Sequence, residues 1–269
     1  MMAIVRVTQE KETDLMNFSE SQWGYHYAYS RSAEARELGD IGQDYLTLAR
    51  NEKQMVFVLC DGISMSYHGD LAAVYLGDRL RQWLITLDEG PLDEGQLTEG
   101  LDRFLKKQTK EANKLVEAHQ LPVNIKGLFR EVMLDKKKLG SSTMYACGRI
   151  DFPSTEQPKG RMVLAWQGDI RIRLWSGVRE QTQCLGNAFY TREQWNSQAG
   201  PVGGVPRIHV SELVKEQVDG TILLYSDGLQ ALDQITIVNQ EDITNAMKQE
   251  ADNPSSDDMA VFQMKWHFV

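Results

Sequence analysis

Two apolar runs in this sequence end on the dipeptide Asp-Gly. The first, 56–62, reads Val-Phe-Val-Leu-Cys-Asp-Gly, and the second, 221–228, reads Thr-Ile-Leu-Leu-Tyr-Ser-Asp-Gly. A third acidic pair, Asp257-Asp258, begins a further strand-like run at 259–264. Short apolar runs bounded by turn signals predict buried strands, whose stiff ends can aim carboxylates at one point. Gathered carboxylates repel one another unless a cation lies between them, and their hard oxygen atoms suit Mg²⁺ or Mn²⁺. The pattern therefore indicates a metal site.

Each of these aspartates also has a plain structural explanation. Asp-Gly is the commonest hairpin turn dipeptide, so one example alone predicts a turn more readily than a ligand. Because the whole pattern of strand followed by Asp-Gly is repeated, we favour the functional interpretation for Asp61 and Asp227. For Asp258, which follows another aspartate at a strand start, we expect a structural role.

Size and charge narrow the class of protein. The 269 residues, with a mass of 30.6 kDa, contain no clear linker, so we expect one domain over 1–269. The net charge of −9 and the sequence pI near 5.1 argue against a nucleic acid or an anionic membrane surface as the main partner, since both favour a basic surface. No apolar stretch approaches the length of a membrane span, and the N-terminus lacks the apolar core of a signal peptide.

The cysteines indicate a reducing compartment. Cys60, Cys147 and Cys184 are widely spaced and odd in number, and two of them lie in strand-like runs. This spacing is typical of reduced, mostly buried thiols, and it fits neither a disulfide framework nor a zinc site. We therefore expect a cytoplasmic protein.

The hydrophobic periodicity predicts consecutive strands and grouped helices. Strands are predicted at 24–30, 44–49, 55–60, 142–147, 161–166, 170–175, 221–226 and 258–268, and helices at 71–85, 95–119, 124–138, 229–233 and 240–250. Residues 1–22 are interpreted as either an edge strand or a loose leader, and 178–206 as irregular. This grouping favours an α+β domain built on antiparallel sheets.

From about residue 24 to 266, the chain resembles the metal-dependent protein phosphatase family (PPM, type 2C). The resemblance rests on motifs that occur in the family's order. They are Gly42-Gln-Asp44, the run 58–62 followed by Gly69, the Gly-Ser-Ser-Thr of 140–143, Trp166-Gln-Gly-Asp-Ile-Arg171, the run 219–229 and Asp257-Asp-Met-Ala260. The fourth and fifth of these motifs are the most specific.

The resemblance implies a sandwich of two antiparallel β-sheets flanked by helices, with a site for two Mn²⁺ or Mg²⁺ ions. By resemblance, Asp61 would bridge the two ions, and the carbonyl oxygen of Gly62 would bind one of them. Asp227 and Asp257 would hold the other ion, and Asp44 would act through metal-bound water. Such ions activate a bridging water and stabilise the attacking and leaving oxygens of an in-line displacement at phosphorus.

Asp169 corresponds to the place where several bacterial members hold a third ion. A turn aspartate that accepts backbone N–H groups, with no metal at all, explains this residue equally well. Both interpretations stay open at this point.

The sequence departs from the family pattern at two places. The family's phosphate-binding arginine lies five residues before the early aspartate, where this chain has Gly39. Arg36 or Arg31 is the candidate to replace it, because a phosphate dianion needs a cationic partner. Eukaryotic members often place a histidine directly after the first Asp-Gly, where this chain has Ile63. We expect His68, in the same loop, to have no catalytic role.

Together these features predict a phosphatase that uses metal-activated water to hydrolyse phosphoserine and phosphothreonine in proteins. Its partners would be phosphorylated proteins and a cognate Ser/Thr kinase system, with no nucleic acid and no membrane. One alternative is a phosphatase-like binding or regulatory module without turnover, which the altered loop 63–68 favours. The retained Asp61, Asp227 and Asp257 oppose it, since an unused acidic cluster costs stability. A phosphohydrolase for small metabolites is a further alternative.

Overall fold

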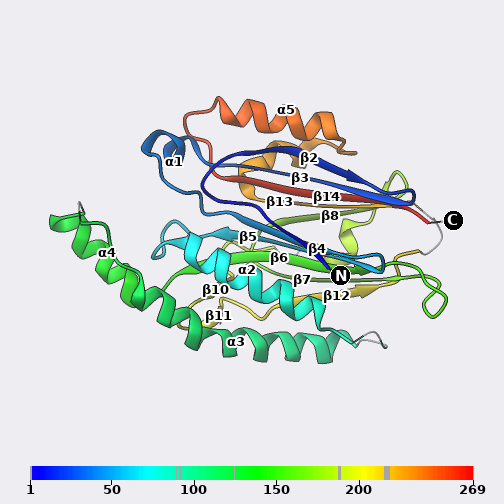
Figure 1. The fold of residues 1–269 in the computed structure, drawn as a ribbon, viewed down its shortest axis with the longest axis horizontal. Coiled ribbons are helices and arrows are strands. Elements are labelled where there is room, and N and C mark those ends of the chain that lie inside the picture. Colours follow the sequence, from blue (N-terminus) through cyan, green and yellow to red (C-terminus); the bar gives the residue numbers. More distant parts are fainter. Residues whose placement is uncertain are drawn as a thin grey trace.

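Two antiparallel β-sheets pack face to face, and helices cover their outer surfaces (Figure 1). The computed structural model describes residues 2–88, 90, 93–123, 125–186, 189–214 and 219–268. Helix α5 (Gln240–Ala251) lies above the upper sheet in Figure 1, and helices α2 (Gly69–Ile85) and α3 (Glu94–Ala118) lie below the lower one. This is the α+β sandwich that the sequence predicts.

The first sheet has the strand order β1-β4-β5-β6-β10-β11, and β7 and β12 extend it from β6. Its strands in the described chain are β1 (Ala3–Arg6), β4 (Tyr45–Arg50), β5 (Gln54–Gly62), β6 (Ser142–Asp151), β7 (Arg161–Gln167), β10 (Gln194–Asn196), β11 (Gly200–Val202) and β12 (Arg207–Ser211). The register of β5 against β6 ends with Gly62 opposite Thr143. The first Asp-Gly pair therefore lies beside the Gly-Ser-Ser-Thr motif.

The second sheet has the strand order β2-β3-β14-β13-β8-β9. Its described strands are β2 (Thr13–Ser19), β3 (Trp23–Ser30), β8 (Arg171–Ser176), β9 (Arg179–Glu180), β13 (Asp219–Tyr225) and β14 (Met259–His267). Although β14 comes last in the sequence, it lies in the middle of this sheet, between β3 and β13. Its neighbours are thus separated widely along the chain.

Two α-helices and two 3₁₀ segments complete the described elements. Helix α1 (Ala33–Leu38) follows β3, and α4 (Gly127–Leu139) precedes β6. The 3₁₀ segments are η1 (Thr182–Leu185) and η2 (Asp227–Gln234). Several helix starts are capped by side chains, as when Asp93 accepts the Gln96 N–H at 2.8 Å at the start of α3. None of the described helices combines the length and apolarity needed to cross a membrane.

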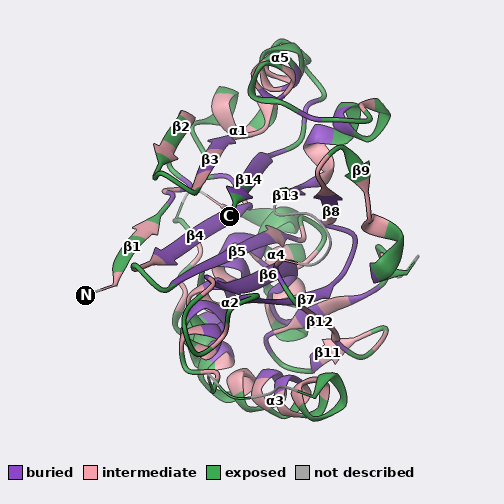
Figure 2. Cartoon of the chain, turned by 90° about the vertical axis from the view of Figure 1, so that its right-hand side faces the viewer, coloured by how far each residue is buried: buried purple, intermediate pink, exposed green. Residues whose placement is uncertain are grey.

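The hydrophobic core lies mainly between the two sheets. Phe57 of β5 and Phe262 of β14 are fully buried and stack with ring centroids 4.7 Å apart, which joins the first sheet to the second. Figure 2 shows that the central strands of both sheets are largely buried. A second apolar cluster lies under α2 and α3, and a third under α5. The two sheets are therefore fixed relative to each other by apolar packing.

Most predicted strands and helices are confirmed to within a few residues. The region 178–206, interpreted as irregular, contains the short strands β9, β10 and β11. Helix α1 and strand β12 were not predicted, and residues 1–22 form the two strands β1 and β2. These elements are short, and three of them, β1, β10 and β12, pair with strands that are distant in the sequence, which local propensity does not encode.

Replacing Phe57 with alanine should lower the free energy of unfolding by about 3–5 kcal/mol, because it leaves a cavity at the contact between the sheets. Urea denaturation followed by circular dichroism measures this. Val178→Ala is the control, since Val178 is exposed and its truncation should change stability by less than about 0.5 kcal/mol. Equal effects of the two substitutions would contradict the central role given to the stacked pair.

Candidate functional site

A strongly acidic cleft, with a volume of about 480 Å³, opens at one end of the sandwich. Seven acidic residues line it, namely Glu34, Asp44, Asp61, Asp169, Asp227, Asp257 and Asp258. The described residues that line the cleft include no Lys or Arg. A concave site with this charge attracts cations and repels free anions.

The first sheet brings two of these carboxylates together. Asp61 is the penultimate residue of β5, and Asp44 directly precedes β4. Because Tyr45 and Cys60 are partners in the register of β4 and β5, Asp44 and Asp61 lie next to each other at the same end of the sheet. The early aspartate and the first Asp-Gly pair thus meet through strand pairing.

The second sheet contributes three more carboxylates at the same end of the sandwich. Asp227 follows β13, Asp257 precedes β14, and Asp169 precedes β8. Strand β13 pairs with both β14 and β8 as far as Tyr225, so these three positions are adjacent at the same end of the sheet. The predicted residues therefore come from both sheets and line one cleft.

The Gly-Ser-Ser-Thr motif at 140–143 holds the loop that follows the first Asp-Gly pair. The hydroxyl of Thr143 donates to the carbonyl oxygen of Asp61 at 2.7 Å. The N–H of Ile63 donates to the carbonyl oxygen of Ser142 at 3.0 Å. These bonds fix the backbone on both sides of Gly62, so the orientation of Asp61 depends on β6 as well as on β5.

Close contact between two backbone segments explains the glycines at this position. A Cβ atom added to Gly62 would lie 2.6 Å from the carbonyl carbon of Gly69, and one added to Gly69 would lie 2.5 Å from the nitrogen of Ile63. Real Cβ atoms do not approach backbone this closely, so only glycine fits at either position. Helix α2 can therefore begin directly behind the carboxylate of Asp61.

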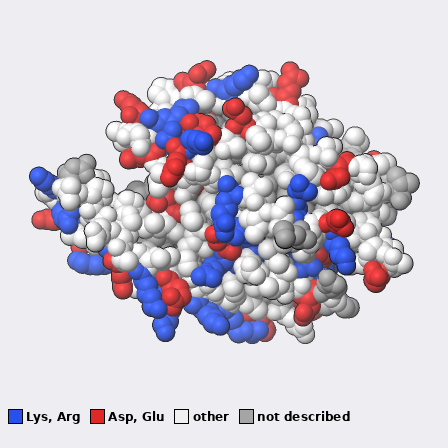
Figure 3. Space-filling model, viewed as in Figure 1, with Lys and Arg blue, Asp and Glu red and all other residues white. Residues whose placement is uncertain are grey.

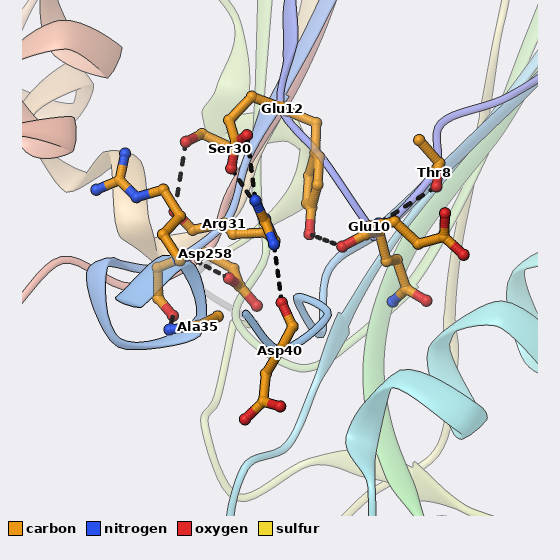
Figure 4. Close-up of polar contacts among 12 residues, drawn as sticks. Thr8, Glu10, Glu12, Ser30, Arg31, Ala35, Asp40 and Asp258 are labelled. Atoms are coloured by element: carbon orange, nitrogen blue, oxygen red, sulfur yellow. Dashed lines mark hydrogen bonds and ion pairs between the residues drawn. The ribbon is translucent and has the colours of Figure 1, made fainter. Parts of the chain in front are cut away.

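Asp258 has the structural role expected for it. Its Oδ1 accepts the Ser32 N–H at 2.6 Å, and its Oδ2 accepts the N–H of Gln43. Figure 4 shows this carboxylate at the start of helix α1. Asp258 thus ties the start of β14 to two segments of the cleft rim, and burial raises its pKa while these hydrogen bonds lower it.

The two candidate arginines make other contacts and do not line the cleft. Arg31 donates to both carboxylate oxygens of Glu12, at 2.9 and 3.3 Å, and to the carbonyl oxygen of Asp40 at 3.0 Å (Figure 4). Arg36 donates to the carbonyl oxygen of Ala251 at 2.7 Å. Their role in phosphate binding stays a prediction.

The electrostatic state of the cleft follows from burial and mutual repulsion. Burial raises the pKa of Asp61 well above its usual range, and repulsion from Asp227 and Asp257 adds to this effect. The pKa of Asp227 is also raised, by burial first and then by Asp257 and Asp169. Burial raises the pKa of Asp44, and Asp61 adds to it. Ionised carboxylates in this site are therefore costly without a compensating cation.

Oxygen atoms without partners fit a cation in this cleft. Asp44 Oδ2 and Gln43 Oε1 are buried and have no hydrogen-bond partner among the described residues. Both residues line the cleft, and both atoms are hard oxygen donors of the kind that Mg²⁺ and Mn²⁺ prefer. As they stand, no three Asp, Glu, His or Cys side chains in the described ranges are arranged to close around one ion. The oxygen donors are of the type that binds a divalent ion, but their side chains are not yet arranged around one.

The sequence places Arg171 in the fourth motif, but its contacts with Asp169 and Asp233 were not predicted. Arg171 donates to the carbonyl oxygen of Asp169 at 2.5 Å and lies 3.5 Å from the carboxylate of Asp233. Its positive charge lowers the pKa of Asp169 and of Asp227. The fourth motif was the available signal, since it joins the aspartate and the arginine two residues apart. His68 does not line the cleft, and its expected lack of a catalytic role stays a prediction.

Asp61→Asn should raise the melting temperature of the protein in a chelating buffer. A carboxyl whose pKa is raised in the folded state binds protons more tightly there than in the unfolded chain, whose aspartate pKa is about 3.9. Stability therefore falls as the pH rises from that value through the folded pKa. The gain from Asn, a few degrees, should be larger at about pH 8 than at about pH 5.

Differential scanning fluorimetry at both pH values measures this, with Asp14→Asn on the exposed surface of β2 as the control. A gain that is the same at both pH values, or is absent, would show that Asp61 is not destabilised by its charge.

Comparisons with known proteins place the fold. No protein-family model matches the sequence, and a sequence comparison with curated proteins finds no match. Among solved structures, the chain is similar to the serine/threonine phosphatase Stp1 from Staphylococcus aureus. The identity is 16%, the match covers 94% of this chain and 98% of that one, and the TM-score is 0.59.

Two further structures extend the similarity. The serine-threonine phosphatase 2C from Toxoplasma gondii matches with 12% identity over 98% of this chain and 99% of that one, with a TM-score of 0.57. RsbX, solved in complex with magnesium, matches with 10% identity over 94% of this chain and 99% of that one, also with a TM-score of 0.57. The protein therefore has the fold of the type 2C serine/threonine phosphatases, as its motifs predict.

Proposed function

We propose that this protein is a metal-dependent phosphomonoesterase that removes phosphate from phosphoserine and phosphothreonine in proteins. The observation that carries the proposal is the cleft, where acidic residues from both sheets meet and no described Lys or Arg is present. The negative charge of the cleft repels a phosphate dianion unless bound cations neutralise the carboxylates. The same cations would stabilise the ionised form of Asp61, whose pKa is raised by burial first and then by repulsion from Asp227 and Asp257.

The chain offers ligands for two divalent ions, Mn²⁺ or Mg²⁺. Asp61 would be shared between the two ions, and the carbonyl oxygen of Gly62 would bind one of them. Asp227 and Asp257 would hold the other. Asp44 would act through a water molecule. When bound, the ions supply an activated water and the positive charge that stabilises the transition state of phosphoryl transfer. RsbX, which has a similar fold, binds magnesium in its crystal structure.

Asp169 is proposed as the ligand of a third ion. It lines the cleft and is largely buried, with a relative exposure of 8%. Burial raises its pKa, while Arg171 lowers it. Because Arg171 partly compensates its charge, a third ion should bind more weakly than the first two.

The surrounding residues fix parts of the cleft backbone before any ion binds. Thr143 fixes the backbone of Asp61, and Asp258 fixes the backbone of Ser32 and Gln43 at the rim. Only the carboxylate side chains then have to move to close around an ion, which limits the conformational freedom lost on binding. The catalytic role of the chain is thus mainly positioning.

For the substrate phosphate, Arg36 is the better of the two arginine candidates. It follows Ala35, which lines the cleft, and its guanidinium donates a hydrogen bond to a backbone carbonyl oxygen, with no carboxylate holding it in a bidentate pair among the described residues. Arg31, by contrast, is held by both oxygens of Glu12. Arg36→Ala should raise KM for an aryl phosphate several-fold and change kcat less, as loss of ground-state binding does.

Steady-state kinetics with Arg31→Ala as the comparison tests this assignment. If neither substitution changes KM or inhibition by inorganic phosphate, the phosphate is bound without either arginine.

We also propose the partners and the cellular location of the protein. Phosphorylated proteins would be substrates, and a Ser/Thr kinase system would supply them. A cytoplasmic location is proposed because the widely spaced Cys60, Cys147 and Cys184 are not joined by disulfides within the described residues. A module without turnover remains the main alternative function, because loop 63–68 and the arginine position depart from the family pattern.

Asp227→Asn should abolish hydrolysis of an aryl phosphate at millimolar Mn²⁺ while the protein stays folded. Asparagine keeps the shape of the side chain and one oxygen, but it removes the negative charge that holds a divalent ion, which costs several kcal/mol of transition-state stabilisation. Asp219→Asn is a matched control, because Asp219 begins the same strand at the opposite end and is exposed. It should leave the rate unchanged.

The wild-type rate should also fall to background in a chelating buffer and return when Mn²⁺ or Mg²⁺ is added. If the wild-type protein binds Mn²⁺ in calorimetry but hydrolyses no phosphoester, the binding-module alternative is correct and the catalytic proposal is wrong.

A further inference from the structure

Helix α4 carries apolar side chains that the rest of the protein leaves uncovered. Leu128 is 76% exposed, Phe129 is 59% exposed and Val132 is 43% exposed. No residue of this helix is buried. Residues three and four apart lie on one face of a helix, so these three side chains form one apolar patch, which we call the α4 patch. Exposed clusters of this kind mark binding surfaces.

Helix α4 is attached to the body near its C-terminal end. Lys137 donates to the carbonyl oxygens of Glu117 and His119 at 3.0 and 2.6 Å, and the carbonyl oxygen of Leu139 accepts from Asn196 at 3.0 Å. The remainder projects from the body, at the left of Figure 1. A helix of this length is marginal in water by itself. A partner on the α4 patch would therefore add stability as well as contact area.

The α4 patch is continuous with the rim of the cleft. The row Leu128, Val132, Lys136 follows the four-residue spacing of one helix face. At its end, Lys136 Nζ donates to the carbonyl oxygen of Ser64 at 3.1 Å. Ser64 lines the cleft, and its neighbour Met65 is 79% exposed. A protein whose phosphorylated residue enters the cleft would thus pass Met65 and reach α4.

The charge around the α4 patch defines the partner's chemistry. Between 126 and 138 the chain has five basic residues, Lys126, Arg130, Lys136, Lys137 and Lys138, and two acidic ones, Glu131 and Asp135. This local excess of positive charge contrasts with the net charge of −9 of the whole chain. Figure 3 shows Lys and Arg side chains along the projecting arm, with some Asp and Glu side chains and uncharged surface between them. An acidic segment with apolar anchors is complementary to such a face.

We propose that the α4 patch, with Met65, docks an acidic segment of the phosphoprotein substrate that carries apolar anchors. This inference rests on the proposed phosphatase function. Helix α4 spans about 20 Å, which corresponds to roughly six residues of extended chain. The docking segment therefore lies within roughly ten residues of the phosphorylated side chain in the substrate. Docking of this segment lowers KM for substrates that carry it and leaves kcat unchanged.

Synthetic phosphothreonine peptides test the proposal. One peptide is short, and two others carry a Leu-, Phe- and Glu-rich segment roughly six residues before or after the phosphothreonine. The better extended peptide should have a KM roughly tenfold lower than the short one, with the same kcat. Leu128→Gln combined with Phe129→Gln should remove this advantage and leave the short peptide and an aryl phosphate unaffected. Glutamine preserves helix propensity, so α4 should stay folded.

Val178→Gln is the matched control, because Val178 is 78% exposed and lies in the turn between β8 and β9. It should change none of these values. If aryl phosphate is hydrolysed but all three peptides share one KM, docking on α4 is wrong and the phosphatase function stands.

A binding measurement keeps the two proposals separate. Fluorescence anisotropy of the labelled extended peptide should show binding that the α4 double substitution weakens roughly tenfold, even if no turnover is detected. In that case docking is supported and the phosphatase function has failed. If sedimentation instead shows a dimer that the double substitution dissociates, and the peptide does not bind, the α4 patch joins two copies and the docking proposal is overturned.

Discussion

Repulsion among carboxylates at one end of the sandwich is the constraint on which the rest of the structure depends. Asp44 and Asp61 come from the first sheet, while Asp169, Asp227 and Asp257 come from the second. The apolar contact between the sheets, centred on the stacked Phe57 and Phe262, must therefore oppose a force that drives the sheets apart at this end. Burial makes each ionised carboxylate more costly, because it removes the water that would screen the charges, and this cost raises the pKa of Asp61.

Hydrogen bonds to the backbone carry much of the positioning in this site. The hydroxyl of Thr143 and the N–H of Ile63 hold the backbone around Asp61, and the carboxylate of Asp258 holds Ser32 and Gln43. The two bonds around Asp61 join uncharged groups, so they keep their geometry whether or not a cation neutralises the carboxylates. In the proposed metal site, these bonds would keep the cleft backbone in place while the carboxylate side chains close around an ion.

The sequence predicts the strand ends well, because β5 and β13 are continuous apolar runs that stop at Asp-Gly, a signal contained within a few residues. It does not predict helix α1 or strands β10 and β12, whose few residues contact partners far away in the chain. The same limit applies to Arg31. Its pairing with Glu12 depends on how residues 9–12 lie against the end of β3, and no local pattern encodes this. The lining of the cleft by Gln43 and Glu34 was missed for that reason.

The position of β14 has a consequence for synthesis of the protein. This strand lies between β3 and β13, and Asp258 at its start bonds to Ser32, which is 226 residues earlier in the chain. At a translation rate of about 5–20 residues per second, β3 waits roughly 10–45 seconds for its neighbour. During that interval its edge is unpaired, and the second sheet is open at its centre. During this period, a chaperone or another nascent chain can pair with the exposed edge of β3. The cleft forms only after β14 has inserted between β3 and β13.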